Sequence, residues 1–112
     1  MSEELQSIEL SIEQAKETIK NRDDLRKLVN NRMFKNLITE GYFEKEAIRL
    51  VLLKATPDMQ SEEDQTAIIK AMDAIGGLRQ YFTTIMQMGA MADRALKDDE
   101  ETREEILSEG AE

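Results

Sequence analysis

Histidine, cysteine and tryptophan are absent from the 112 residues, and the chain has only one proline and five glycines. Without cysteine or histidine it cannot form disulfides, the usual zinc sites or the nucleophile–histidine pairs of many hydrolases. Phosphate-binding glycine loops and EF-hand spacing are also missing from the sequence. We therefore expect no catalytic residues, no metal site and no cofactor, and we expect the protein not to be an enzyme.

Aromatic residues make up only 4% of the chain, whereas hydrophobic residues make up 40%. Any core must therefore be aliphatic and rich in methionine. The few Pro and Gly residues cannot supply the turns of a many-stranded β fold, and the abundant Glu, Leu, Ala, Lys, Gln and Met favour helix. The composition predicts an all-α fold with a single helical domain over residues 1–103.

Long apolar runs are also missing. The longest is Leu50-Val51-Leu52-Leu53, far short of the ~20 residues that span a bilayer. The start, MSEELQSIEL, is acidic and lacks the basic and apolar regions of a secretory signal. We expect an intracellular protein with no membrane partner.

The net charge of −9 is spread unevenly, with −4 over residues 1–19, +4 over 20–35, −2 over 36–97 and −7 over 98–112. An acidic total argues against general binding to nucleic acids. Two interpretations of the basic stretch remain open. It is either a solvated helix face or a set of contacts to phosphates or an acidic partner, made by Arg26, Lys27, Arg32 and Lys35.

Apolar side chains near the start follow a heptad spacing: Leu5, Ile8, Ile12, Ala15 and Ile19. This 3–4 alternation predicts a helix over 3–21, capped by Ser2, that pairs with another helix. The stripe is narrow, so we expect the helix to need a partner.

The middle of the chain, residues 25–54, is expected to form a compact block of short helices after a polar break at 21–24, where Asp23 or Asp24 can cap the next helix. Gly41 is a candidate helix stop, followed by a short helix over 44–54. This helix–glycine–helix rhythm is similar to a DNA-binding helix-turn-helix. However, Glu44 and Glu46 would then face the phosphates and be repelled.

A longer helix is predicted over 61–97, starting at a capping-box-like Ser61. Its heptad positions are Ile68, Ala71, Ile75, Leu78, Phe82, Ile85, Gly89, Ala92 and Leu96. The first helix is expected to pack along this one as a hairpin, or the stripe serves as a seam between copies. The glycines Gly76-Gly77 and Gly89 are candidates for close helix crossings on a shared stripe, and a hinge at Gly76-Gly77 is the alternative. Residues 104–112 are expected to form a flexible acidic tail.

The stretch Met86–Ala92 combines methionines with small residues, which allow close approach and adapt to irregular partners. We interpret it as a protein interface, with a plainly packed core as the alternative. The expected contact residues are Phe82, Ile85, Met86, Met88, Gly89, Met91 and Ala92.

In NRMFKNLITEGYF at 31–43, EAIRLV at 46–51 and AIGGLR at 74–79, the chain resembles small acidic helical proteins of tailed bacteriophages. The resemblance implies a virion or assembly component, such as a head, portal-associated or scaffold-like protein. It would act in the host cytoplasm during assembly or in the virion, as a homo-oligomer or with other phage structural proteins. Two alternatives stay open: an acidic inhibitor of a host nucleic-acid enzyme, and a DNA-packaging or regulatory subunit that uses residues 25–54.

Overall fold

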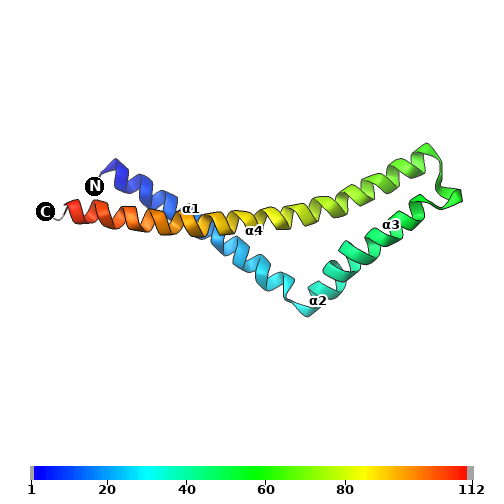
Figure 1. Cartoon of the computed structure of the whole chain (residues 1–112), viewed down its shortest axis with the longest axis horizontal. Coiled ribbons are helices and arrows are strands. Elements are labelled where there is room, and N and C mark those ends of the chain that lie inside the picture. Colours follow the sequence, from blue (N-terminus) through cyan, green and yellow to red (C-terminus); the bar gives the residue numbers. More distant parts are fainter. Residues whose placement is uncertain (1, 111–112) are drawn as a thin grey trace. The chain divides into compact units, whose positions relative to one another are not determined.

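A computed structural model describes residues 2–110, which are almost entirely helical and contain no strand (Figure 1). The all-α prediction is therefore confirmed, with a long N-terminal helix packed on a long C-terminal helix and short helices between them. The elements are α1 (Glu3–Val29), α2 (Arg32–Phe34), the π-helix η1 (Lys35–Glu46), α3 (Ala47–Lys54), the 3₁₀ turn η2 (Pro57–Met59) and α4 (Glu62–Gly110).

The chain divides into two compact units, and α4 contributes to both. Unit 1 contains the residues up to Leu25 and those from Thr84 onward, and unit 2 is Arg26–Thr83. The sequence pattern does not indicate this division.

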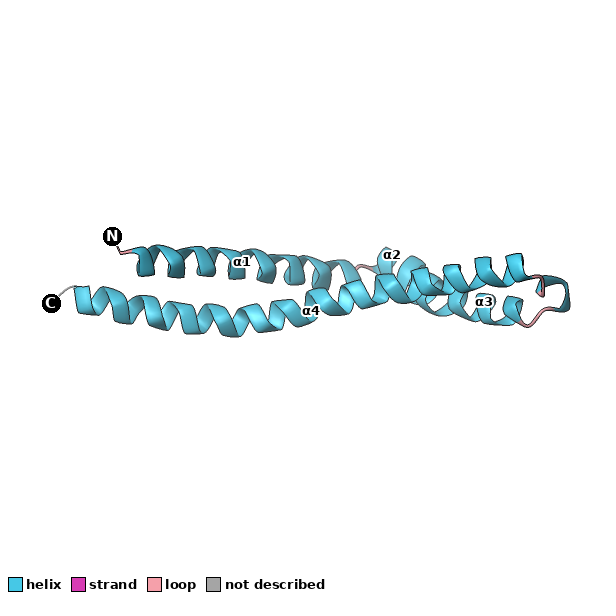
Figure 2. Ribbon diagram, turned by 90° about the horizontal axis from the view of Figure 1, so that it is seen from above, coloured by secondary structure: helices cyan, strands magenta, loops and turns pink. Residues whose placement is uncertain are grey.

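In unit 1, α1 and the C-terminal part of α4 lie side by side and run in opposite directions (Figures 1 and 2). Three of the five predicted heptad positions of α1 are buried, Leu5, Ile12 and Ala15, and the other two are half-buried. The Ser11 hydroxyl donates a 2.6 Å hydrogen bond to Asp99 across the pair. The predicted stripe therefore serves as the seam of an antiparallel hairpin.

The two helices approach closely at Arg22, which continues the stripe three residues beyond Ile19. Its side chain crosses Gly89, where an added Cβ would overlap the Cβ and Cγ of Arg22. Its guanidinium donates to Asp93 at 2.7 Å and to Asp23 at 2.8 Å, and only 8% of the residue is exposed. These hydrogen bonds raise the pKa of Arg22 above its ordinary value, so it stays charged.

The expected end of the first helix at residue 21 is wrong, because α1 continues to Val29. Asp23 pairs with Arg22 and does not cap a new helix. The break falls at Asn31 instead, whose side chain accepts hydrogen bonds from the amides of Met33 and Phe34 and caps α2.

In unit 2 the core contains Leu50 of α3 and Ile68 and Ile75 of α4. All five aromatic residues of the chain lie in this unit. Phe82 is their centre, with its ring 5.9 Å from Phe34 and 6.0 Å from Phe43. The compact block expected around 25–54 thus includes the first part of α4.

The predicted helix stop at Gly41 is also wrong. Gly41 lies inside the π-helix η1, and no glycine among the described residues has a positive φ. A Cβ at this position would lie 3.0 Å from the carbonyl oxygen of Asn36. Glycine therefore suits the wide π turn, and the turn that a helix-turn-helix needs is absent from residues 32–54.

The long helix α4 extends past its predicted end at 97 to Gly110. Its start matches the prediction, since the Asp64 amide donates to the Ser61 hydroxyl at 3.0 Å. The partly buried residues Asp99, Arg103 and Ile106 continue the heptad spacing. Packing on this stripe explains why residues 104–110 are helical although their acidic composition predicts a flexible tail. Residues 111–112 of that tail lie outside the described residues.

The helix runs without a break through Gly76-Gly77, so the hinge is not seen there. A Cβ on either glycine would meet nothing within 4 Å, so neither marks a close crossing. Of the predicted crossings, only the one at Gly89 is confirmed.

We predict opposite effects for alanine at two glycines of α4. Gly76→Ala should raise the free energy of unfolding by ~0.5–1 kcal/mol, because it improves helix propensity without a clash. Gly89→Ala should lower it by ~1–3 kcal/mol, because the new Cβ overlaps the Arg22 stem. Urea denaturation followed by circular dichroism measures both, and equal effects of the two changes would contradict the close approach.

Candidate protein-interaction surface

Helix α3 is apolar on two opposite sides. Its sequence, AIRLVLLK, places Ala47, Leu50 and Leu53 toward the core of unit 2. On the other side, Ile48, Val51 and Leu52 have exposed fractions of 60%, 54% and 66%. We call these three residues the α3 outer face.

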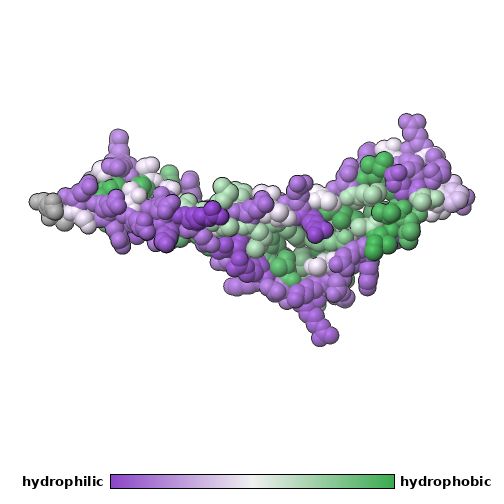
Figure 3. Space-filling model, in the orientation of Figure 1, coloured by the Kyte–Doolittle hydropathy of each residue, from purple (hydrophilic) through white to green (hydrophobic). Residues whose placement is uncertain are grey.

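A helix that is apolar all round is usually buried on every side. The inner side of α3 packs on α4 through Ile68 and Ile75, whereas nothing in the described chain covers the outer face. In the space-filling view, apolar side chains gather over α3 (Figure 3). Contiguous exposed apolar surface of this kind marks interaction sites in soluble proteins.

A further exposed apolar side chain of unit 2, Leu37, lies on η1. A hollow of about 410 Å³ lies beside it, lined by Leu37, Gly41, Tyr42, Lys45, Glu46 and Arg49. Leu37 is 67% exposed. A side chain from a partner that covers α3 can therefore enter this hollow and contact Leu37.

The rim of the hollow is fixed by an ion pair. Arg49 donates from Nε to one oxygen of Glu46 and from Nη2 to the other at 3.1 Å, which is a bidentate arrangement. These hydrogen bonds hold the pKa of Glu46 below its ordinary value and raise that of Arg49. Both side chains are partly exposed, so we assign the pair a positioning role rather than a large share of stability.

The negative charge of the protein is concentrated in unit 1. By sequence, the residues of unit 1 include sixteen acids and six bases, a net charge of −10. Unit 2 contains eight acids and nine bases, a net charge of +1. The unit with the exposed apolar surface is therefore the one that a partner approaches without strong electrostatic repulsion.

The structure divides the predicted contact residues around Met88 among three environments. Gly89 and Ala92 are buried and face α1 in unit 1, so they are contacts within the chain. Phe82 is half-buried in the aromatic cluster of unit 2, and Ile85 and Met86 are half-buried. Only Met88 and Met91 are exposed, at 52% and 65%, and their role in binding stays a prediction.

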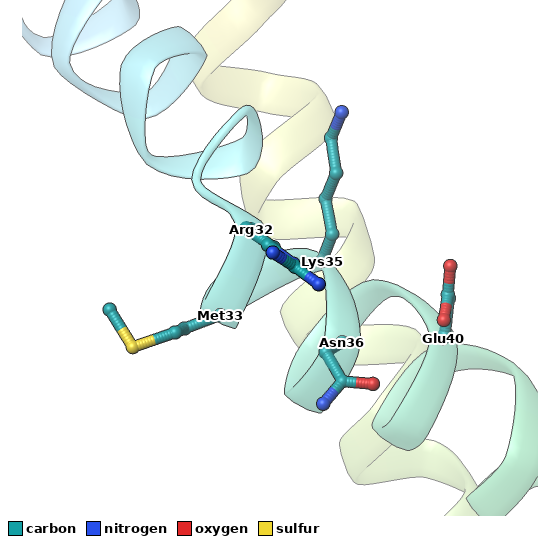
Figure 4. A pocket seen from close by; sticks show the side chains of 5 residues that line it. All are labelled: Arg32, Met33, Lys35, Asn36 and Glu40. Atoms are coloured by element: carbon teal, nitrogen blue, oxygen red, sulfur yellow. The ribbon is translucent and has the colours of Figure 1, made fainter.

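The four predicted cationic contacts, Arg26, Lys27, Arg32 and Lys35, are all exposed. Arg32 and Lys35 line a hollow of about 420 Å³ together with Met33, Asn36 and Glu40. All five side chains come from one short segment, and they spread apart rather than converge on a point (Figure 4). This hollow lacks the convergent polar groups of a ligand site.

The described residues contain no cluster of three or more potential metal ligands. Among them, every deeply buried side-chain nitrogen and oxygen has a hydrogen-bond partner. None of their helices is both long and apolar enough to cross a membrane.

Comparisons with known proteins identify no relative. No family model, no curated protein and no solved structure matches the chain.

Sequence reasoning placed Ile48, Val51 and Leu52 in the compact block and so missed the α3 outer face. The signal was present, since six of the seven residues at 47–53 are apolar and only Arg49 is polar, which leaves this helix little polar surface to expose to water. The sequence could not show that the rest of the chain covers only one side of this helix.

We predict that the Glu46–Arg49 pair contributes stability that is lost on acidification. Because the pKa of Glu46 is lower in the folded state, the contribution is present above the ordinary pKa of glutamate and disappears as the pH falls through the lowered value. From neutral pH to about pH 3, Glu46→Gln should lose less unfolding free energy than the wild type. Urea titrations at each pH measure this, with Glu9→Gln on α1 as the control; equal losses in wild type and Glu46→Gln would contradict the pair.

Proposed function

We propose that this is a non-enzymatic protein-interaction protein, a small structural or assembly component that binds through unit 2. The observation that carries the proposal is the α3 outer face, where three neighbouring aliphatic side chains are more than half exposed on a helix that is also apolar inside. Leu37 and the hollow beside it add a second exposed apolar position in the same unit.

The two units suit different tasks in such a protein. Unit 2 is nearly neutral and carries the exposed apolar surface, which favours docking. Unit 1 carries the acidic excess, which keeps copies from associating through that part of the chain at low ionic strength. An assembly component needs both properties, because it must bind at one surface and remain dispersed elsewhere.

The proposed setting is the particle of a tailed phage, where the protein would be a head, portal-associated or scaffold-like component. This part of the proposal rests on the sequence resemblance at 31–43, 46–51 and 74–79. It implies the host cytoplasm during assembly, or the virion, as the location.

A second candidate function is the inhibition of a host nucleic-acid enzyme. The charge of −10 in unit 1 favours it, because an acidic helical surface can occupy a basic site that normally binds phosphates. This candidate predicts a one-to-one complex with a basic enzyme and no presence in particles.

To test the assembly function, two exposed apolar residues are replaced with aspartate, in unit 2 in one variant and in unit 1 in a second variant. Ile48→Asp with Leu52→Asp should lower incorporation of the tagged chain into particles or assembly intermediates by about tenfold or more, since two charges cannot be buried in an apolar contact. Immunoblots of gradient-purified fractions measure incorporation, and circular dichroism confirms that each variant is helical.

The matched variant, Met88→Asp with Met91→Asp, makes the same change on unit 1 and should leave incorporation close to wild type. Loss with the methionine pair alone would move the interface to unit 1. Absence of the wild-type chain from particles and intermediates alike would contradict the assembly function.

A further inference from the structure

We propose that the α3 outer face binds the same face of a second copy, with the two α3 helices antiparallel about a two-fold axis. This inference rests on the proposed function and identifies a second copy of the chain as the partner of the α3 outer face. It concerns unit 2 alone, and Leu37 with its hollow lies at the edge of the contact.

The first argument is the chemistry of the surface. Ile48, Val51 and Leu52 are aliphatic side chains of the same kind as those in the core of this unit. Interfaces between permanent copies of a chain resemble a domain core cut in half and are more apolar than transient contacts. A second α3 supplies a matching aliphatic surface and covers the side that the chain itself leaves bare.

The second argument is the order of charges along this segment. Residues 40–46 contain Glu40, Glu44 and Glu46 against Lys45, a net charge of −2, whereas residues 47–54 contain Arg49 and Lys54, a net charge of +2. An antiparallel pair places the acidic end of one copy beside the basic end of the other, at both ends at once. A parallel pair would place like charges together.

Arg49 is already held by Glu46 of its own chain. The attraction between copies therefore depends mainly on Glu44 and Lys54. Because the two ends are related by the two-fold axis, each copy contributes one acidic and one basic end, and the contact closes as a dimer.

The third argument is the charge of the two units. Two copies that met through unit 1 would bring together surfaces of −10 each, whereas two copies of unit 2 carry only +1 each. The near-neutral unit is thus the one at which identical chains can associate at ordinary ionic strength.

The test uses the absence of cysteine from the chain, since any single introduced cysteine can form a disulfide only between copies. In an antiparallel pair centred between residues 48 and 52, residue 48 of one copy lies opposite residue 52 of the other. Full-length Ile48→Cys is therefore mixed with tagged Leu52→Cys and oxidised at low micromolar concentration, and the covalent mixed dimer is followed on non-reducing gels. The controls are Leu107→Cys and Met88→Cys, at exposed positions of unit 1. We expect the mixed 48–52 dimer to form at least about tenfold faster than the dimer at 107.

Charge reversal then tests the antiparallel arrangement. With the same charge changes in both chains of the 48–52 mixture, Glu44→Lys or Lys54→Glu alone should slow mixed-dimer formation several-fold, and the two changes together should restore it. Such rescue within one chain is expected only when the partner carries the same substitutions.

Formation of the mixed 48–52 disulfide no faster than of the disulfide at 107 would overturn the inference, as would fastest formation at Met88→Cys. Failure of rescue in the double reversal would overturn the antiparallel arrangement. If cross-linking fails but Ile48→Asp with Leu52→Asp still abolishes incorporation into particles, the α3 outer face binds a different protein. The proposed function then stands while this inference falls.

Discussion

The 49-residue helix α4 imposes the constraint on which the other elements depend. Its heptad stripe continues from Ile68 to Ile106, and each of its positions is buried or half-buried. The chain covers this stripe in two parts, with α1 in unit 1 and with η1 and α3 in unit 2. Helix α3 packs on α4 through one side only. Its opposite side, which is also apolar, stays exposed.

In unit 1 the Arg22–Gly89 crossing sets how α1 is aligned with α4. A long side chain occupies a seam position, and the absent side chain of Gly89 makes room for it. The guanidinium is satisfied by Asp93, one turn further along α4, and by its neighbour Asp23. Ion pairs of low exposure are better at selecting one register than at adding stability. Further along the helix pair, toward the C-terminal end of α4, Ser11 lies within hydrogen-bonding distance of Asp99.

Sequence patterns that extend over several turns predicted the structure well. The stripes of α1 and α4, the caps at Ser2 and Ser61 and the all-α class all follow from periodicity and local hydrogen bonding. Element ends were predicted less well. Asp23 looks like a cap in the sequence but is used by Arg22, and Gly41 looks like a stop but sits in a π turn. The ion pair with the adjacent Arg22 decides the first case, and the unusual helix geometry around Gly41 decides the second.

The candidate site was the hardest part to predict, for a related reason. The sequence shows that Met88 and Ile48 are apolar but not which of them receives cover from the chain. Once the fold assigns Gly89 and Ala92 to the seam with α1, the predicted interface is reduced to two exposed methionines in a strongly acidic unit. The α3 outer face remains as an aliphatic surface in a nearly neutral unit. Charge and burial together therefore favour unit 2 as the binding part.

The most direct test of this account is the absolute mass of the wild-type chain, measured by light scattering during size-exclusion chromatography over a tenfold range of concentration. If a second copy covers the α3 outer face, the mass should stay at twice 12.8 kDa across the range. The single change Leu52→Asp should return it to that of one chain. A wild-type mass of 12.8 kDa at every concentration would contradict the account.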